Sequence, residues 1–149
     1  MRQVGIFGKR KSGKSALMYA LTRHKFNATF RAMEISSVTK VMLVDTVGVD
    51  VEGSTAAESA QSVEVSLMLI CNDSFELELS WISKLRKAGS SVIVVISMAD
   101  TFADGGKALA AAVEEVSGLK PLCVSAETGE GVVELDEKID LELGMRNEE

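Results

Sequence analysis

Residues 8–15, Gly8-Lys9-Arg10-Lys11-Ser12-Gly13-Lys14-Ser15, decide the fold of this chain. They satisfy the pattern G-x-x-x-x-G-K-[ST], in which a glycine-rich turn is followed by a lysine and a hydroxyl residue. The apolar run 4–7 precedes them as a strand, and Leu17, Ala20 and Leu21 follow at helical spacing. A plain turn from strand to helix would require neither the lysine nor the hydroxyl, so the pattern favours a phosphate-binding loop (P-loop).

The loop predicts a site for the phosphates and Mg²⁺ of a purine nucleoside triphosphate. Its glycines let backbone N–H groups turn toward an anion, and the helix that begins near Lys14 directs its positive dipole end there. We expect Lys14 to act as the catalytic residue that bridges the β- and γ-phosphates, and the Ser15 hydroxyl to ligate Mg²⁺. The residues expected to contact the nucleotide are Gly8, Lys9, Arg10, Lys11, Ser12, Gly13, Lys14, Ser15 and Ala16.

Short apolar runs alternate with helical patterns along the rest of the chain. The further expected strands are residues 32–38, 41–44, 63–71, 92–96 and 122–124, and the further helices are 75–87, 105–116 and 131–143. This alternation predicts a three-layer α/β P-loop NTPase fold, with a mostly parallel sheet and helices on both faces. The polar pair Thr39 and Lys40 predicts a hairpin and therefore one antiparallel edge strand.

Asp45 and Gly48 form a second element of the predicted site. Asp45 follows a predicted strand, and the carboxyl end of such a strand is where a second Mg²⁺ ligand is needed. Gly48 would let a backbone N–H approach the γ-phosphate. The alternative for Asp45 is a polar residue that only ends the strand.

Composition limits the domain count and the partners. With 149 residues, 46% of them hydrophobic, the chain can fill one core, which we expect over residues 1–144, followed by a polar tail at 145–149. A net charge of −6 opposes broad capture of nucleic acid or anionic membrane. Cys71 and Cys123 fall in apolar runs and are expected to be buried free thiols. With neither a signal-peptide pattern nor a run near the ~20 residues of a membrane span, we expect a cytoplasmic protein.

Several motifs together resemble a TrmE/Era-type bacterial GTPase. They follow in that family's order: the loop 8–15, Arg31-Ala32-Met33-Glu34-Ile35, Asp45-Thr46-Val47-Gly48 and Val124-Ser125-Ala126-Glu127-Thr128-Gly129-Glu130-Gly131. The chain also resembles the GTPase domain of the hydrogenase-maturation protein HydF, and the likeness covers about residues 4–143. The resemblance implies a GTP-binding switch that binds Mg-GTP, hydrolyses it slowly to GDP and functions in metallocofactor or hydrogenase maturation.

The resemblance also implies a site for guanine. Asp45-x-x-Gly48 corresponds to the family's D-x-x-G element, and Asp100 corresponds to the last residue of N-K-x-D, which would accept hydrogen bonds from the guanine N1 and exocyclic amine. Ala126 occupies the middle of S-A-K, where its backbone N–H would meet the guanine O6. The thioether of Met98 would cover the face of the base. The implied base-site residues are Ser97, Met98, Asp100, Ser125 and Ala126.

The sequence departs from the family at Ser97, Met98 and Glu127, where the family has Asn, Lys and Lys. The first switch is also short, since only residues 24–30 separate Arg23 from Arg31. Thr29 is the one candidate there for a Mg²⁺-closing threonine, although its type favours the edge of the second strand.

These departures leave two alternatives open: a pseudo-GTPase scaffold with little or no turnover, and a P-loop ATPase. In the GTPase reading, a protein partner or a second copy would act through the switch region.

Lys11 occupies the position at which many TrmE-like and HydF-like GTPases have an asparagine that helps to hold an activating K⁺. The long first switch that would complete such an ion site is absent as well. We hypothesise that the ammonium of Lys11 replaces the ion near the phosphates. The alternative is that Lys11 points into solvent beside Lys9 and Arg10.

Two further residues attract a functional interpretation that we do not favour. His24, the only histidine, is expected to complement the dipole at the end of a helix. Trp81 lies in the apolar stripe of the helix predicted over 75–87 and is expected in the core, with a partner surface as the alternative.

Overall fold

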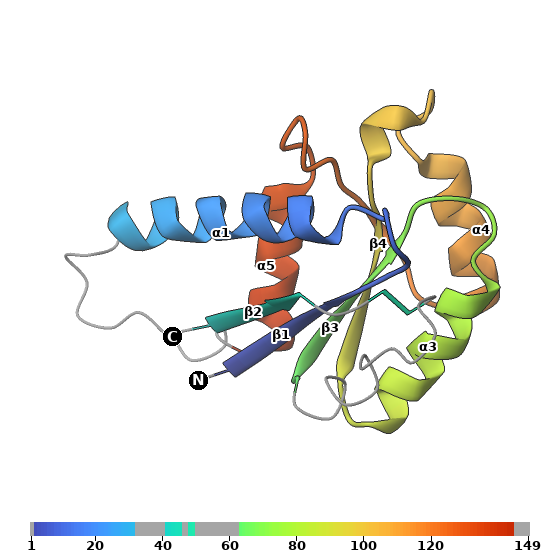
Figure 1. Ribbon diagram of the computed structural model, residues 1–149, viewed down its shortest axis with the longest axis horizontal. Helices are drawn as coiled ribbons and strands as arrows, with labels where there is room; N and C mark the ends of the chain where they lie inside the picture. The colour runs from blue at the N-terminus through green and yellow to red at the C-terminus, as the bar shows by residue number, and fades with distance from the viewer. Residues whose placement is uncertain (1, 32–40, 46–47, 50–62, 145–149) are drawn as a thin grey trace.

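A five-stranded parallel sheet forms the centre of the protein (Figure 1). The computed structural model describes residues 2–31, 41–45, 48–49 and 63–144. In spatial order the strands are β2 (Val41–Asp45), β1 (Arg2–Phe7), β3 (Val65–Ile70), β4 (Ser91–Ile96) and β5 (Leu122–Cys123). Every neighbouring pair is parallel.

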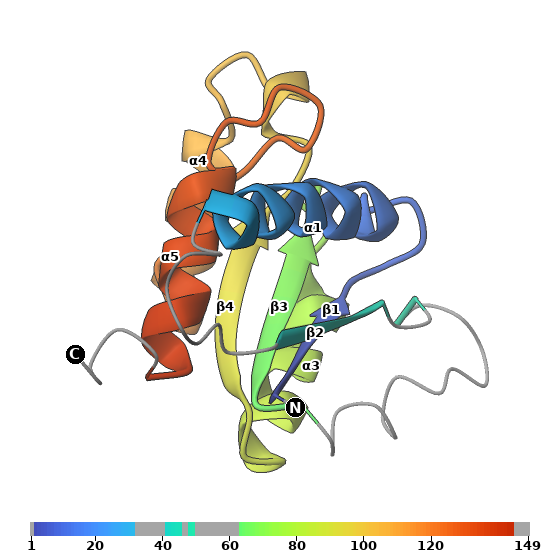
Figure 2. The same ribbon diagram turned by 90° about the vertical axis from the view of Figure 1, so that its left-hand side faces the viewer.

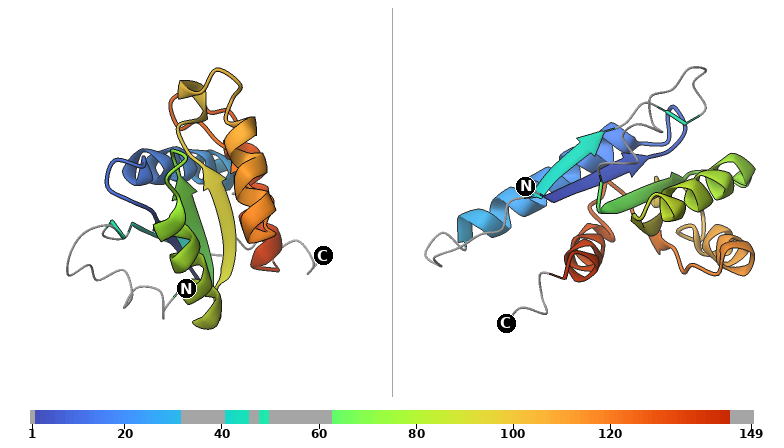
Figure 3. Two further views of the ribbon diagram at one scale, coloured as in Figure 1. Left: turned by 90° about the vertical axis from the view of Figure 1, so that its right-hand side faces the viewer. Right: turned by 90° about the horizontal axis from the view of Figure 1, so that it is seen from below.

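Helices cover both faces of the sheet. Helices α1 (Lys14–Arg31) and α5 (Val132–Glu142) lie on one face, which Figure 2 shows in front. Helices α3 (Glu76–Lys87) and α4 (Lys107–Ser117) lie on the other face (Figure 3). The predicted three-layer α/β architecture is therefore confirmed.

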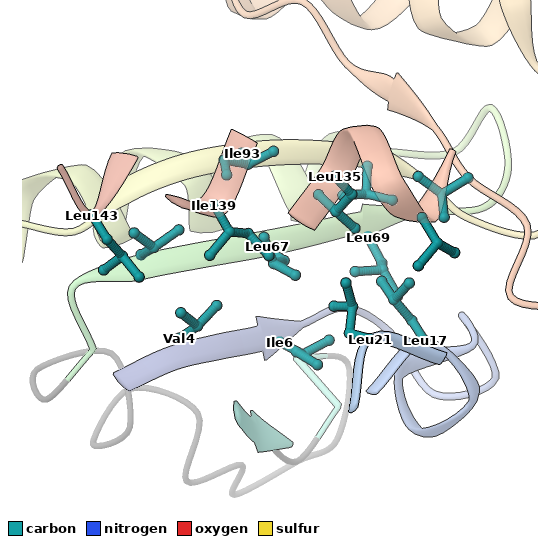
Figure 4. Packing of buried hydrophobic residues seen from close by; sticks show 14 residues of the cluster. Val4, Ile6, Leu17, Leu21, Leu67, Leu69, Ile93, Leu135, Ile139 and Leu143 are labelled. Carbon is teal, nitrogen blue, oxygen red and sulfur yellow. The ribbon is translucent and has the colours of Figure 1, made fainter. Parts of the chain in front are cut away.

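The core has two halves, one on each face of the sheet. The central strand β3 is buried at every position, so Leu67 and Leu69 face α1 and α5 while Met68 and Ile70 face α3 and α4. This explains its continuous apolar sequence, which is typical of a parallel strand covered on both sides. Figure 4 shows the first half, in which the labelled residues include Val4, Ile6, Leu17, Leu21, Leu67, Leu69, Ile93, Leu135, Ile139 and Leu143.

The predicted elements that fall within the described residues agree with the structure apart from their ends. Helix α4 begins at Lys107, later than expected, because Gly105 and Gly106 have left-handed φ values of 73° and 87°. At this start the Asp104 carboxylate accepts hydrogen bonds of 2.9 Å from the N–H groups of Gly106 and Ala108. These hydrogen bonds lower the pKa of Asp104. The strand predicted over residues 32–38, its antiparallel pairing and the tail 145–149 lie outside the described residues.

Two predictions fail because α1 is longer than the sequence suggested. The helix continues through Arg31, so Thr29 lies in a helix and not at a strand edge. Residues 24–30 contain no glycine or proline that would end a helix. His24 is not a helix cap either, since it lies within α1 with its Nε2 3.3 Å from Asp136 Oδ2 on α5.

Trp81 lies in the core, as expected. Its side chain is only 7% exposed and belongs to the half of the core beneath α3 and α4. The Lys84 ammonium lies 4.7 Å from the centroid of the ring.

The glycine before α5 gives a first prediction. Gly131 has a φ of 82°, and a Cβ there would overlap the carbonyl oxygen of Cys123 and lie 3.2 Å from Val124 Cα. We expect Gly131→Ala to lower the free energy of unfolding by about 2 kcal/mol more than Gly118→Ala does, as measured by urea denaturation. Gly118 is the matched control, because it has a φ of 75° but nothing within 4 Å of its Cβ position. Equal losses in the two variants would contradict this account.

Candidate nucleotide-binding site

The loop 8–13 leaves the sheet at its carboxyl edge, between β1 and α1. Strand β1 lies between β2 and β3, so the chain crosses over to opposite sides of β1 and makes a topological switch point there. Ligands of open parallel sheets bind outside such a point. The segments that follow β4 and β5 rise from the same edge (Figures 1 and 2).

The two glycines of the loop occupy positions that disfavour a side chain, Gly8 for lack of space and Gly13 because of its backbone conformation. A Cβ on Gly8 would come within 2.6 Å of Ser12 Oγ and 3.1 Å of Leu69 Cβ. Gly13 adopts a φ of 92°, and its Cβ position lies 3.5 Å from Met98 Cγ. A 3.2 Å hydrogen bond from the Ser12 N–H to the Lys9 carbonyl closes the turn. The loop is thus bent back toward the start of α1, as a phosphate-binding loop requires.

The charged side chains of the loop point to different places. Lys14 Nζ donates to the Lys9 carbonyl at 2.8 Å and so stays beside the loop. Lys9 Nζ instead donates to the Ser74 carbonyl, which precedes α3, and lies 3.3 Å from Glu78 Oε1 in that helix. Arg10 and Lys11 are exposed, and Lys11 has a φ of 63°.

Ser12, Ser15 and Ala16 complete the description of the loop. Ser12 is 1% exposed, and its Oγ has no hydrogen-bond partner among the described residues. A buried hydroxyl such as that of Ser12 is costly without a partner and suits a site that a polar ligand completes. Ser15 and Ala16 lie exposed in the first turn of α1.

The D-x-x-G element lies beside the loop. Asp45 is the last residue of β2 and pairs in register with Ile6 of β1, two positions before Gly8. Both Gly48 and Val49 are buried, and the Val49 N–H donates to the Gly8 carbonyl at 3.0 Å. The structure therefore brings Gly48 to the loop and ends β2 at the same edge of the sheet.

A cavity of about 200 Å³ opens beside the loop and contains four of the five residues assigned to the base. Its lining residues are Gly13, Ala16, Leu17, Ser97, Met98, Asp100, Thr101, Val124, Ala126 and Glu127. Ser97 is buried, and its Oγ has no partner among the described residues. Of the lining residues, Leu17, Thr101, Val124 and Glu127 were not assigned to the site from sequence.

Ser125, the fifth residue assigned to the base, orients Asp100. Its buried hydroxyl donates to Asp100 Oδ1 at 2.8 Å and accepts from the Thr128 N–H at 3.1 Å. A 3.1 Å hydrogen bond from the Ala99 N–H to the Val124 carbonyl joins the two segments. A carboxylate has about four acceptor sites, so Asp100 can also accept hydrogen bonds from a ligand.

Cys71 and Cys123 are free thiols, as expected, but half-buried. Burial raises the pKa of both. Glu78 raises the pKa of Cys71 further, whereas Lys9 and Lys14 lower it. Neither thiol is therefore activated as a nucleophile.

The described residues contain no group of three His, Cys, Asp or Glu side chains placed to hold a metal ion. Nor does this part of the chain include a helix that could span a membrane.

Solved structures share the fold at low sequence identity. The chain is similar to the G-domain of FeoB from Methanococcus jannaschii, at 19% identity and a TM-score of 0.66 over 95% of this chain and 98% of that one. It is similar to the G domain of the T. maritima FeoB iron transporter, at 19% identity and a TM-score of 0.68 over 96% and 99% of the two chains.

The translation elongation factor SelB from Methanococcus maripaludis, in complex with the GTP analogue GppNHp, is also similar. It shows 21% identity and a TM-score of 0.69 over 96% of this chain and 34% of that one. No curated protein matches the sequence.

One family matches the sequence itself. The family described as "50S ribosome-binding GTPase" matches residues 3–98, which include the phosphate-binding loop, Asp45 and Gly48. The match covers more than half of the chain. The protein is therefore a member of this family of GTP-binding P-loop proteins.

Proposed function

We propose that the protein is a molecular switch that binds Mg-GTP and hydrolyses it slowly to GDP. The observation that carries this proposal is the shared cavity, which Gly13 of the phosphate-binding loop and Asp100 both line. A ligand that contacts both must have anionic groups at one end and hydrogen-bond donors at the other. A guanine nucleotide meets this requirement, since guanine presents N1–H and an exocyclic amine.

The proposed roles at the phosphate end follow the geometry of the loop. The backbone N–H groups of residues 8–16 would surround the phosphates, and the Lys14 ammonium would move from the Lys9 carbonyl toward the β- and γ-phosphates. Gly48, held near the loop, would approach the γ-phosphate. Ser15 and Asp45 would hold Mg²⁺, whose preference for hard oxygen ligands their hydroxyl and carboxylate fit. That ion would neutralise charge between the phosphates.

At the base end, Asp100 would accept from the guanine N1 and amine, and the Ala126 N–H would donate to O6. Ser125 fixes the Asp100 carboxylate, which makes this acceptor preorganised. Ser97 and Met98 would contact the ring. We assign the cofactors GTP or GDP and Mg²⁺ on this basis.

We propose that intrinsic hydrolysis is slow, since the residues directly after Gly48 in the sequence include no obvious catalytic base. Positions 49–52 after Gly48 are Val, Asp, Val and Glu, without a glutamine. We propose that a protein partner or a second copy supplies the missing charge through the switch region.

The same proposal includes a closer relationship to TrmE/Era and HydF proteins and a role in metallocofactor or hydrogenase maturation. It also includes a single domain over residues 1–144 and a cytoplasmic location.

One observation favours the alternative of a nucleotide-binding scaffold or an ATPase. The charged residues that line the described cavity, Asp100 and Glu127, are both acidic, and Met98 brings no charge. The base would therefore bind without the lysines that the family places there.

Removing the lysine of the loop tests the central claim. We expect Lys14→Ala to abolish detectable GTP and GDP binding, because the ammonium meets the phosphates and is not part of the core. Calorimetric titration of both proteins with GTP, GDP and ATP, with and without Mg²⁺, measures this. Lys120→Ala, at an exposed lysine before β5, is the matched control. Wild-type GTP affinity in a folded Lys14→Ala variant would rule out the proposed site.

Removing the carboxylate at the base end tests nucleotide choice. Asp100→Ala should reduce the preference for GTP over ATP by about a hundredfold, the order expected when two hydrogen bonds specific to one base are lost. Affinity for ATP should change little, because the phosphate contacts remain. Competition binding with GTP and ATP gives both values. A wild-type protein that binds the two equally would favour the scaffold or ATPase alternative.

Lys11 gives a prediction about monovalent cations. We expect GTP turnover by the wild-type protein to be the same in matched K⁺ and Na⁺ buffers, because the Lys11 ammonium supplies the charge. Asparagine tolerates the left-handed backbone of this position, so Lys11→Asn should fold and turn over more slowly. Phosphate release assays provide the measurement. Clear stimulation of the wild type by K⁺ would refute the hypothesis and leave Lys11 as a solvated residue.

A further inference from the structure

The side chain of Lys9 ties the phosphate-binding loop to α3. Its ammonium donates to the Ser74 carbonyl at 2.5 Å and lies 3.3 Å from Glu78 Oε1. Glu78 belongs to the first turn of α3, and only 1% of its surface is exposed. A carboxylate buried to this extent requires compensation by a cation. The charge of Lys9 is therefore used to stabilise Glu78.

The same residue also holds Lys14 through its backbone. The Lys9 carbonyl accepts the 2.8 Å hydrogen bond from Lys14 Nζ. Glu78, Lys9 and Lys14 thus form a continuous series of contacts from the interior of α3 to the phosphate-binding lysine. The contacts of the Lys9 side chain at α3 restrict the movement of residue 9. They thereby fix the position of the backbone carbonyl that accepts from Lys14 Nζ.

The half-buried thiol of Cys71, just after β3, lies in the same electrostatic neighbourhood. Burial raises its pKa most, Glu78 raises it further, and Lys9 and Lys14 lower it. The three side chains that the contacts connect therefore share this thiol as a neighbour.

We propose that Glu78 is a positioning residue for phosphate binding and acts on Lys14 through Lys9. This inference rests on the proposed function, because it gives Glu78 a role in the same site. A lysine has many rotamers, and holding its ammonium beside the loop before the ligand arrives reduces the entropy lost on binding. Helix α3 in this way controls the strength of phosphate binding, although it does not line the cavity.

A purely structural role for Glu78 makes a different prediction. In that case its loss would weaken the fold and reduce the binding of every nucleotide alike. A positioning role affects only the ligands that Lys14 meets, namely those with a β-phosphate. The comparison of GDP with GMP separates the two, since both carry the same base and sugar.

The test uses Glu78→Gln, which keeps the shape of the side chain and removes its charge. The affinities for GDP and GMP are measured by competition with a fluorescent GDP analogue, and circular dichroism verifies the fold. We expect GDP affinity to fall about tenfold while GMP affinity stays unchanged, the order typical when a group that orients a binding residue is lost. The control is Glu142→Gln in the exposed Lys138–Glu142 pair of α5, which should leave both affinities unchanged.

A second variant keeps the test decisive if Glu78→Gln folds poorly. The double replacement Lys9→Met with Glu78→Leu removes both charges, a change that buried pairs often tolerate, and should repeat the tenfold loss.

A ratio of GDP to GMP affinity that stays unchanged in Glu78→Gln or in the double variant would overturn the inference and leave the proposed function standing. Equal losses of affinity for the two nucleotides would mean the same. A wild-type protein that binds GDP no more tightly than GMP would overturn the proposed function and this inference with it.

Discussion

The parallel pairing of β1 with two neighbours is the constraint on which the site depends. Ile6 lies opposite Asp45 on β2 and opposite Leu67 on β3, which fixes where each strand ends relative to the others. Because the chain crosses to opposite sides of β1, Gly8 leaves the sheet at the point where these two connections diverge. A loop at this point is open to a ligand while its backbone remains held, as the hydrogen bond from Val49 to Gly8 illustrates.

Close packing then fixes the conformation of the loop. Charged side chains make the loop side of the cavity basic and the opposite side acidic. Gly8 lies against Leu69, and Gly13 lies against Met98, so the bend of the loop also forms a wall of the neighbouring cavity. The loop is basic, whereas the far side of the cavity carries Asp100 and Glu127. A ligand with an anionic end and a donor-rich end is oriented by this difference before any single contact is complete.

Much of this arrangement could be predicted from sequence because it is local. The strand, the glycine-rich loop and the start of a helix are adjacent in the chain, and apolar periodicity located the other elements. Contacts between distant residues were not predictable in this way. Glu78 falls within the helix predicted over residues 75–87, and nothing in the sequence showed that it meets Lys9. The partnership of His24 with Asp136 was hidden for the same reason, because it depends on how α1 crosses α5.

Trp81 gives the protein an intrinsic optical probe. It is the only tryptophan of the chain, and its indole packs in the cluster that also contains Phe7 and Val49, on either side of the point where the loop meets the D-x-x-G element. The ammonium of Lys84 lies above the ring, and indole emission is sensitive to such a nearby charge. A change in the packing of this cluster would therefore alter the emission of a single fluorophore, which requires no added label.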